Sequence, residues 1–259
     1  MLQSTPQGWR QHPALNIVQC DLLNHNQLTH GITIKDYREQ NFAYATSKDH
    51  NLVDIDRRWF ATAFGMTIEQ AVFANQVHGS EVEIVNNLLP QPPTCDAMIT
   101  NSPGRLLCIT VADCLAILFF DPVRMVIAIA HSGWRGTAAN IVGKTLGAMW
   151  KEYGSLPRHC LVAVGPGISA SGYEVDATVY HTFSTELQQS PQVFATSRVG
   201  HWHLDLTKAV ENQLLAAGVS RSNISVSPWR TDTHPVLFHS HRMTHNCPRF
   251  AASIGLKTL

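Results

Sequence analysis

Three side chains in the middle of the chain could hold a metal ion: His78, Cys114 and His131. Imidazole nitrogen and cysteine thiolate are ligands that Zn²⁺ takes in tetrahedral geometry, and a catalytic zinc site uses three protein ligands and leaves a fourth position open. All three residues lie at or next to predicted strands, so a shared pocket is sterically feasible. Because no short HxxxH or CxxC pattern connects them, spacing alone favours the alternative without metal, in which His78 is a turn histidine, Cys114 a core thiol and His131 a strand-end histidine.

The same residues suit two metal-free alternatives. Cys114 as nucleophile and His131 as general base would make a cysteine hydrolase or amidase acting on a peptide or cell-wall precursor. A non-enzymatic binding or scaffold module would instead tolerate Cys114→Ser. Metal content and alkylation of Cys114 separate these possibilities.

A glycine-containing turn after His131 could bind an anion. We expect the turn to span residues 132–136 and Thr137 to cap a helix from Ala138 to about Trp150. Free N–H groups at a helix start, together with Arg135, favour phosphate or carboxylate. The candidate substrate-binding residues are Gln76, Ser132 and Arg135.

Two apolar runs must position these groups. The first extends from Leu106 to Phe120 and is interrupted only by Asp113 and Cys114, and the second extends from Met125 to Ala130. Neither alternates polar with apolar residues, which predicts two neighbouring strands buried on both faces. An Asp and a Cys inside such a strand need partners, since burying them unpaired is costly.

The remaining pattern predicts an α+β or mixed α/β protein with partly antiparallel sheets, folded as a single domain over residues 1–259. No GxGxxG motif is present, which removes the dinucleotide-binding fingerprint. Further strands are expected at 14–21 as an edge strand, 31–34, around Val72 and Val82, 97–99, 160–164, 224–226 and 249–254, and helices at 53–64 (ending at Gly65), 176–188 and 205–217.

Composition narrows the class of partner. The formal net charge is zero, which argues against nucleic acid and against a polybasic membrane anchor. No apolar run approaches the ~20 residues needed to cross a bilayer, and the first residues lack a signal-peptide apolar region. We therefore expect a soluble cytoplasmic protein in which most of the six scattered cysteines are reduced, with Cys108 and Cys160 serving as small core residues. Oligomeric state is left open.

Five sequence blocks resemble one bacterial family, the polyphenol-oxidase or laccase-like domain proteins, reinterpreted as zinc-dependent purine nucleoside phosphorylases. The pairing of Ala-Asp-Cys with His-x-Gly-Trp-Arg-Gly is especially specific. The blocks are Asn75-Gln76-Val77-His78-Gly79, Cys95-Asp96-Ala97-Met98, Thr110-Val111-Ala112-Asp113-Cys114, His131-Ser132-Gly133-Trp134-Arg135-Gly136 and Gly165-Pro166-Gly167-Ile168.

The resemblance implies a single αββα-type domain with mixed sheets covered by helices, related to the cysteine hydrolase fold of cytotoxic necrotizing factor. It implies zinc on His78, Cys114 and His131. Together with Arg135, which the anion-binding turn places among the candidates, these residues are the predicted catalytic site. The implied activity is phosphorolysis of adenosine, inosine and methylthioadenosine, with adenosine deamination as a companion activity.

Copper oxidation is a further alternative. Two His-x-His pairs, His201 with His203 and His239 with His241, are similar to those that multicopper oxidases place on copper clusters. Such enzymes also need a blue-copper site on cupredoxin sandwiches, for which this chain is too short and too helical. Cu²⁺ nevertheless remains an alternative ion for the predicted site, because it competes well for N and S ligands.

Overall fold

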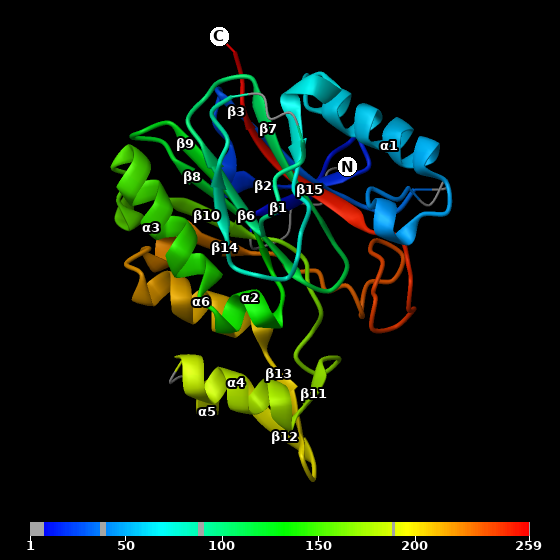
Figure 1. The fold of residues 1–259 in the computed structure, drawn as a ribbon, viewed down its shortest axis with the longest axis vertical. Helices are drawn as coiled ribbons and strands as arrows, with labels where there is room; N and C mark the ends of the chain where they lie inside the picture. Colours follow the sequence, from blue (N-terminus) through cyan, green and yellow to red (C-terminus); the bar gives the residue numbers. More distant parts are fainter. Residues whose placement is uncertain (1–7, 37–39, 88–90, 188–189, 259) are drawn as a thin grey trace.

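The computed structural model describes residues 8–36, 40–87, 91–187 and 190–258, and its centre is a pair of six-stranded mixed sheets (Figure 1). The first sheet has the order β1 (Trp9–Gln11), β2 (Ile17–Cys20), β3 (Leu28–Thr33), β15 (Phe250–Leu256), β7 (Arg105–Val111) and β4 (Ala71–Phe73). The second has the order β14 (Ile224–Val226), β10 (Leu161–Val164), β8 (Leu115–Asp121), β9 (Val126–Ser132), β6 (Ala97–Thr100) and β5 (Val82–Ile84). The expectation of partly antiparallel, mixed sheets is confirmed.

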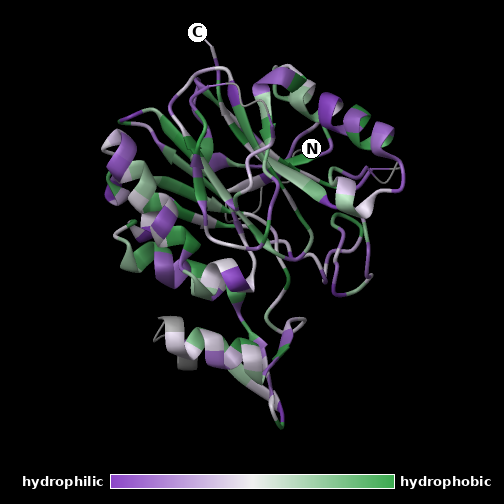
Figure 2. Cartoon of the chain, in the orientation of Figure 1, coloured by the Kyte–Doolittle hydropathy of each residue, from purple (hydrophilic) through white to green (hydrophobic). Residues whose placement is uncertain are grey.

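The sheets form the two inner layers of a four-layer arrangement. Helix α1 (His50–Ala63) covers the outer face of the first sheet, and α3 (Ile141–Tyr153) and α6 (Leu206–Ala216) cover the second (Figure 1). Hydrophobic residues concentrate in the sheets, whereas α1 and α3 also carry hydrophilic residues (Figure 2). The αββα layering implied by the resemblance is therefore present.

Period-two alternation explains why the central strands are apolar throughout. In β7, Leu107 and Ile109 face the second sheet, while Leu106 and Cys108 face α1. Strand β8 alternates in the same way between the other sheet and the helices. Each strand is buried on both faces, as predicted, because each face has its own apolar layer to contact.

The run from Leu106 to Phe120 is two strands and not one, and this corrects the sequence interpretation. Strand β7 belongs to the first sheet and β8 to the second, and the chain crosses between the sheets at Ala112–Cys114. Asp113 adopts a left-handed backbone conformation with φ of 85°. The polar pair therefore lies in a turn between sheets, where it faces a cavity. Strands β8 and β9 are neighbours, as predicted, and pair antiparallel from Leu115 opposite Ser132 to Asp121 opposite Val126.

The helix expected from Ala138 to Trp150 is also divided. A short helix α2 (Trp134–Ala138) begins directly after Gly133, and α3 begins after Asn140, whose side chain accepts a hydrogen bond from the Gly143 backbone N–H. Thr137 is not a cap, since its hydroxyl donates to the Gly133 carbonyl from inside α2.

Two other expectations need correction. Strand β2 is not at the edge, because β1 pairs with it on the outside. Helix α1 starts three residues early, at His50, since Asp49 caps it, and Gly65 follows the cap residue Phe64 with a φ of 71°. The Asp205 cap of α6 and the strand at Ile224–Val226 agree with prediction.

A third, three-stranded sheet was not expected. It consists of β11 (Glu174–Asp176), β13 (His201–Leu204) and β12 (Phe194–Arg198), and lies with α4 (Ala177–Leu187) and the short α5 (Ser190–Val193) at the lower end of Figure 1. Stacking of Tyr180 on Trp202, with ring centroids 4.3 Å apart, joins α4 to this sheet. Among the described residues, no helix is both long and apolar enough to cross a membrane.

Candidate metal centre and its cavity

His78, Cys114 and His131 converge where the two sheets meet. Their ligand atoms all lie within 4.8 Å of one another, although the residues come from three separate segments. His78 lies in the connection between β4 and β5, Cys114 in the turn before β8, and His131 near the end of β9. The imidazole rings of His78 and His131 meet edge to face, with centroids 4.8 Å apart. The structure thus brings together all three predicted metal-binding residues.

Asp96 holds both histidines, and its role was not recognised in the sequence. One carboxylate oxygen accepts from the His78 backbone N–H at 3.0 Å and contacts His131 Nδ1 at 2.7 Å. The other oxygen accepts from the backbone N–H groups of Val77 at 3.2 Å and Gly79 at 2.6 Å. This cradle fixes the connection in which His78 has a φ of 59°. A carboxylate directly before a fully buried strand was the available signal.

Electrostatic coupling favours a thiolate at Cys114. Burial raises the pKa of Cys114, but the positive charge of His131 and its interaction with the sulfur outweigh burial, so the pKa falls below that of a free thiol. Burial conversely lowers the pKa of His131, and the Cys114 and Asp96 charges raise it by more. Burial also opposes ionisation of Asp96, yet its hydrogen bonds from His131 and Gly79 keep the pKa of that carboxyl below its usual value.

Two glycines make room for the cluster. A Cβ on Gly133 would lie 2.9 Å from the Cys114 sulfur and 3.5 Å from the His78 ring. A Cβ on Gly136 would lie 2.8 Å from the Gly79 carbonyl oxygen. The glycines of this turn are therefore required by close approach, which spacing alone could not reveal.

The donor set fits a metal ion such as Zn²⁺. Two imidazoles and one thiolate are a ligand combination that zinc accepts, and three protein ligands leave one position open. Since Asp96 engages Nδ1 of His131, Nε2 is left for the metal, which is the carboxylate–histidine arrangement found behind many zinc ligands. The observed proximity therefore satisfies the requirements of ligand type, number and outer support.

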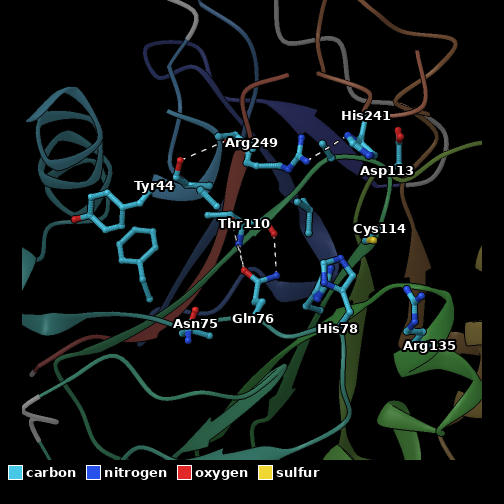
Figure 3. A pocket seen from close by; sticks show the side chains of 18 of the residues that line it. Tyr44, Asn75, Gln76, His78, Thr110, Asp113, Cys114, Arg135, His241 and Arg249 are labelled. Atoms are coloured by element: carbon cyan, nitrogen blue, oxygen red, sulfur yellow. Dashed lines mark hydrogen bonds between the residues drawn. The ribbon is translucent and has the colours of Figure 1, made fainter. Parts of the chain in front are cut away.

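The cluster opens into a cavity of about 780 Å³ (Figure 3). This volume lies within the usual range for small-molecule sites, roughly 300–1,000 Å³. The lining includes Tyr44, Arg57, Phe73, Gln76, His78, Thr110, Asp113, Cys114, His131, Trp134, Arg135, Tyr173, His241, Arg242 and Arg249.

Of the three predicted substrate-binding residues, two line the cavity and one does not. Arg135 is exposed in α2, stacks on Trp134 with its guanidinium carbon 4.3 Å from the ring, and lines the cavity. Gln76 also lines it, but its amide bonds the backbone N–H and carbonyl of Thr110 at 2.8 and 2.9 Å. It thereby anchors the segment that carries His78. Ser132 lies outside the lining, fully buried, with its hydroxyl 2.7 Å from that of Thr137.

Asp113 has a structural function in the cavity wall. Its carboxylate accepts from the Thr231 hydroxyl at 2.6 Å and from the Arg242 backbone N–H at 2.7 Å. It therefore ties two C-terminal loop segments to the turn that carries Cys114. These two hydrogen bonds are the partners that a buried Asp at this position was expected to need, although the residue lies in a turn and not inside a strand.

The His-x-His pairs do not form a second centre. His201 and His203 lie in β13, and of the other pair only His241 lines the cavity. Within the described residues, the only group of three or more His, Cys, Asp or Glu side chains close enough to share a metal ion is His78, Cys114 and His131.

The protein is a mixed α/β protein with a candidate His–Cys–His metal site at the junction of two sheets. Its family follows from comparison: the family model described as multi-copper polyphenol oxidoreductase laccase matches residues 26–257. The chain belongs to this family.

Relatives share most of the chain. A Geobacillus stearothermophilus protein named purine nucleoside phosphorylase YlmD is 33% identical over 226 residues, covering 83% of this chain and 82% of that protein. A Deinococcus radiodurans purine nucleoside phosphorylase is 35% identical, with coverages of 81% and 79%. The crystal structure of YlmD from Geobacillus stearothermophilus matches with a TM-score of 0.90 at 30% identity, covering 98% of this chain and 100% of that one.

Proposed function

We propose that this protein is a zinc-dependent purine nucleoside phosphorylase. The observation that carries the proposal is the His78–Cys114–His131 cluster, backed by Asp96, at a cavity that also contains Arg135. Its relatives named purine nucleoside phosphorylase, such as those at 33% and 35% identity, support the same reaction.

In phosphorolysis, a phosphate oxygen forms a bond to C1′ of the ribose while the C1′–N9 bond to the purine breaks, and the purine leaves with the bonding electrons and takes up a proton. Arg135, which carries no carboxylate partner among the described residues, is assigned to orient the phosphate and reduce repulsion on its approach. His78, Cys114 and His131 would hold the zinc, which when bound supplies Lewis acidity. Asp96 keeps His131 oriented throughout.

The finer assignments belong to the same proposal. The substrates are adenosine, inosine and methylthioadenosine, and adenosine deamination is the companion activity, because a Lewis-acidic site can also activate water. Cu²⁺ is the alternative ion. We assign the chain to the cytoplasm and to a single domain of the cytotoxic-necrotizing-factor-like cysteine hydrolase fold.

Turnover with defined nucleosides tests the proposal. Purified zinc-loaded protein is incubated with adenosine or inosine, with and without phosphate, and free base and ribose 1-phosphate are quantified. We expect both products only when phosphate is present, and inosine from adenosine in either condition. Cys114→Ser should abolish both activities. Absence of base release under zinc-loaded conditions would contradict the assignment.

A cysteine hydrolase is the second candidate, since one observation favours it specifically. Cys114 with a lowered pKa, His131 with a raised pKa, and Asp96 bonded to His131 together resemble a nucleophile, base and orienting carboxylate. This candidate predicts an active metal-free protein that is inactivated by alkylation of Cys114. The phosphorylase predicts loss of activity when zinc is removed and recovery when it is returned.

A further inference from the structure

The cavity contains more positive charge than phosphorolysis requires. Four arginine side chains line it, and in the described part of the chain none of them forms an ion pair with a carboxylate. Asp113, the acidic residue among the described lining, already accepts from Thr231 and the Arg242 backbone. The four are Arg57, Arg135, Arg242 and Arg249. One phosphate beside Arg135 leaves the other three without a function in the reaction.

Neutral groups hold two of these arginines in place. Arg242 donates to the Glu174 backbone carbonyl at 2.8 Å and lies 5.1 Å from the centre of the Tyr173 ring. Arg249 donates to the Cys247 carbonyl at 2.9 Å, and its other terminal nitrogen is 3.4 Å from His241 (Figure 3). Such contacts fix the orientation of a guanidinium group without neutralising its charge.

Arg57 is the most constrained of the four. Its guanidinium carbon lies between two rings, 4.3 Å from the centre of Tyr44 and 4.1 Å from that of Phe73, and Nε donates to the Phe42 carbonyl. Asp54, the nearby carboxylate, accepts instead from the Tyr44 hydroxyl at 2.5 Å. Arg57 is half-buried, and a cation held there without a paired carboxylate is less favourable than one that an anion reaches. The cavity is the route by which such an anion would arrive.

Arg57 and the two rings around it lie far from the His78–Cys114–His131 cluster. Phe73 pairs with Cys108 in the first sheet, and β7 continues to Val111 before the turn to Cys114. The strand portion alone, three residues, measures about 10 Å. A nucleoside with its ribose at the cluster therefore occupies the near part of the cavity and leaves the Arg57 end open.

We infer that the cavity binds purine nucleoside 5′-diphosphates, with the nucleoside near the His78 cluster and the diphosphate directed toward Arg249 and Arg57. Guanidinium groups form charge-assisted, often bidentate hydrogen bonds with phosphate oxygens, and they do so most strongly where water is excluded. The purine identity of the ligand depends on the function proposed above. The anion-binding end depends only on the arginines.

Calorimetric titration of zinc-loaded protein with adenosine, AMP and ADP, without Mg²⁺, tests the inference. We expect ADP to bind at least roughly tenfold more tightly than adenosine, with AMP between them. The advantage of ADP should shrink as ionic strength rises, whereas adenosine binding should change little. Equal affinities for the three ligands would overturn the proposal.

Substitution locates the effect. Arg57→Gln should reduce the affinity for ADP to about that for AMP and leave adenosine binding unchanged, and Arg221→Gln, a surface arginine paired with Glu211, is the matched control. An equal loss for all three ligands would show that Arg57 only supports the fold. If Arg57→Gln does not fold, the ligand series and its salt dependence on the unaltered protein decide.

The diphosphate site and the proposed phosphorylase activity can be refuted independently of each other. Tight ADP binding without phosphorolysis of adenosine or inosine would contradict the proposed function and leave the diphosphate site intact. Phosphorolysis without preferential ADP binding would do the reverse.

Discussion

Replacing Asp96 with asparagine should weaken zinc binding and stability together. The carboxylate accepts four hydrogen bonds, two on each oxygen, from His131 and the backbone N–H groups of residues 77–79. An amide keeps one acceptor oxygen, so two donors, at least one of them a partly buried backbone N–H group, lose their partner and face an NH₂ group. At about 1–3 kcal/mol for each unsatisfied donor, the loss of stability is about 2–6 kcal/mol.

The effect on zinc follows from orientation. Carboxylates that hold a metal-binding histidine typically contribute about 10- to 100-fold to metal affinity, and Asp96 also fixes the backbone of His78. Zinc affinity is measured by competition with a chelating dye, and stability by urea unfolding of the metal-free protein. Asp49→Asn is the control, because asparagine caps a helix about as well as aspartate does. Unchanged zinc affinity in a folded Asp96→Asn protein would refute the reasoning.

Further predictions concern the cluster and its anion partner. Gly133→Ala should lower zinc affinity at least roughly tenfold, since its Cβ would lie 2.9 Å from the Cys114 sulfur. The control Gly147→Ala, which has open space around it in α3, should leave stability unchanged or raise it slightly. Dye competition measures the zinc affinity of both variants, and thermal unfolding measures their stability. Arg135→Ala should raise the phosphate concentration needed for phosphorolysis and leave adenosine deamination largely intact, and an equal loss of both activities would argue against its assigned role. In metal-free protein, iodoacetamide followed by mass spectrometry should modify Cys114 first at pH 7, because its lowered pKa keeps the thiolate present below the usual thiol range; added zinc should protect it.

Much of the fold was predictable from local pattern. Strands buried on both faces have long apolar runs, and the Asp205 cap marks the start of α6 clearly. The pattern could not show that the chain changes sheets at Asp113, because β7 and β8 have the same composition on either side of the turn. The third sheet was missed since β12 is largely exposed and therefore lacks an apolar face.

The three residues that converge could be predicted from the sequence as candidate ligands, but the carboxylate that supports them could not. The residue types identified His78, Cys114 and His131 as candidate metal ligands, and the resemblance of the surrounding sequence blocks supported that choice. Asp96 was missed because its partners are backbone N–H groups and a histidine 35 residues away, and the position of a carboxylate before a buried strand does not identify those partners. Ser132 was predicted to bind substrate because it follows His131, but strand β9 extends through Ser132 and the residue is buried.

The metal content of the purified protein tests the central claim most directly. We predict one tightly bound zinc ion per chain after loading and removal of free metal, measured by elemental analysis, and the same value for His181→Ala, an exposed histidine on α4. His78→Ala and Cys114→Ser should each retain far less than one. If the unaltered protein retained no more zinc than these two variants, the account of this site would be contradicted.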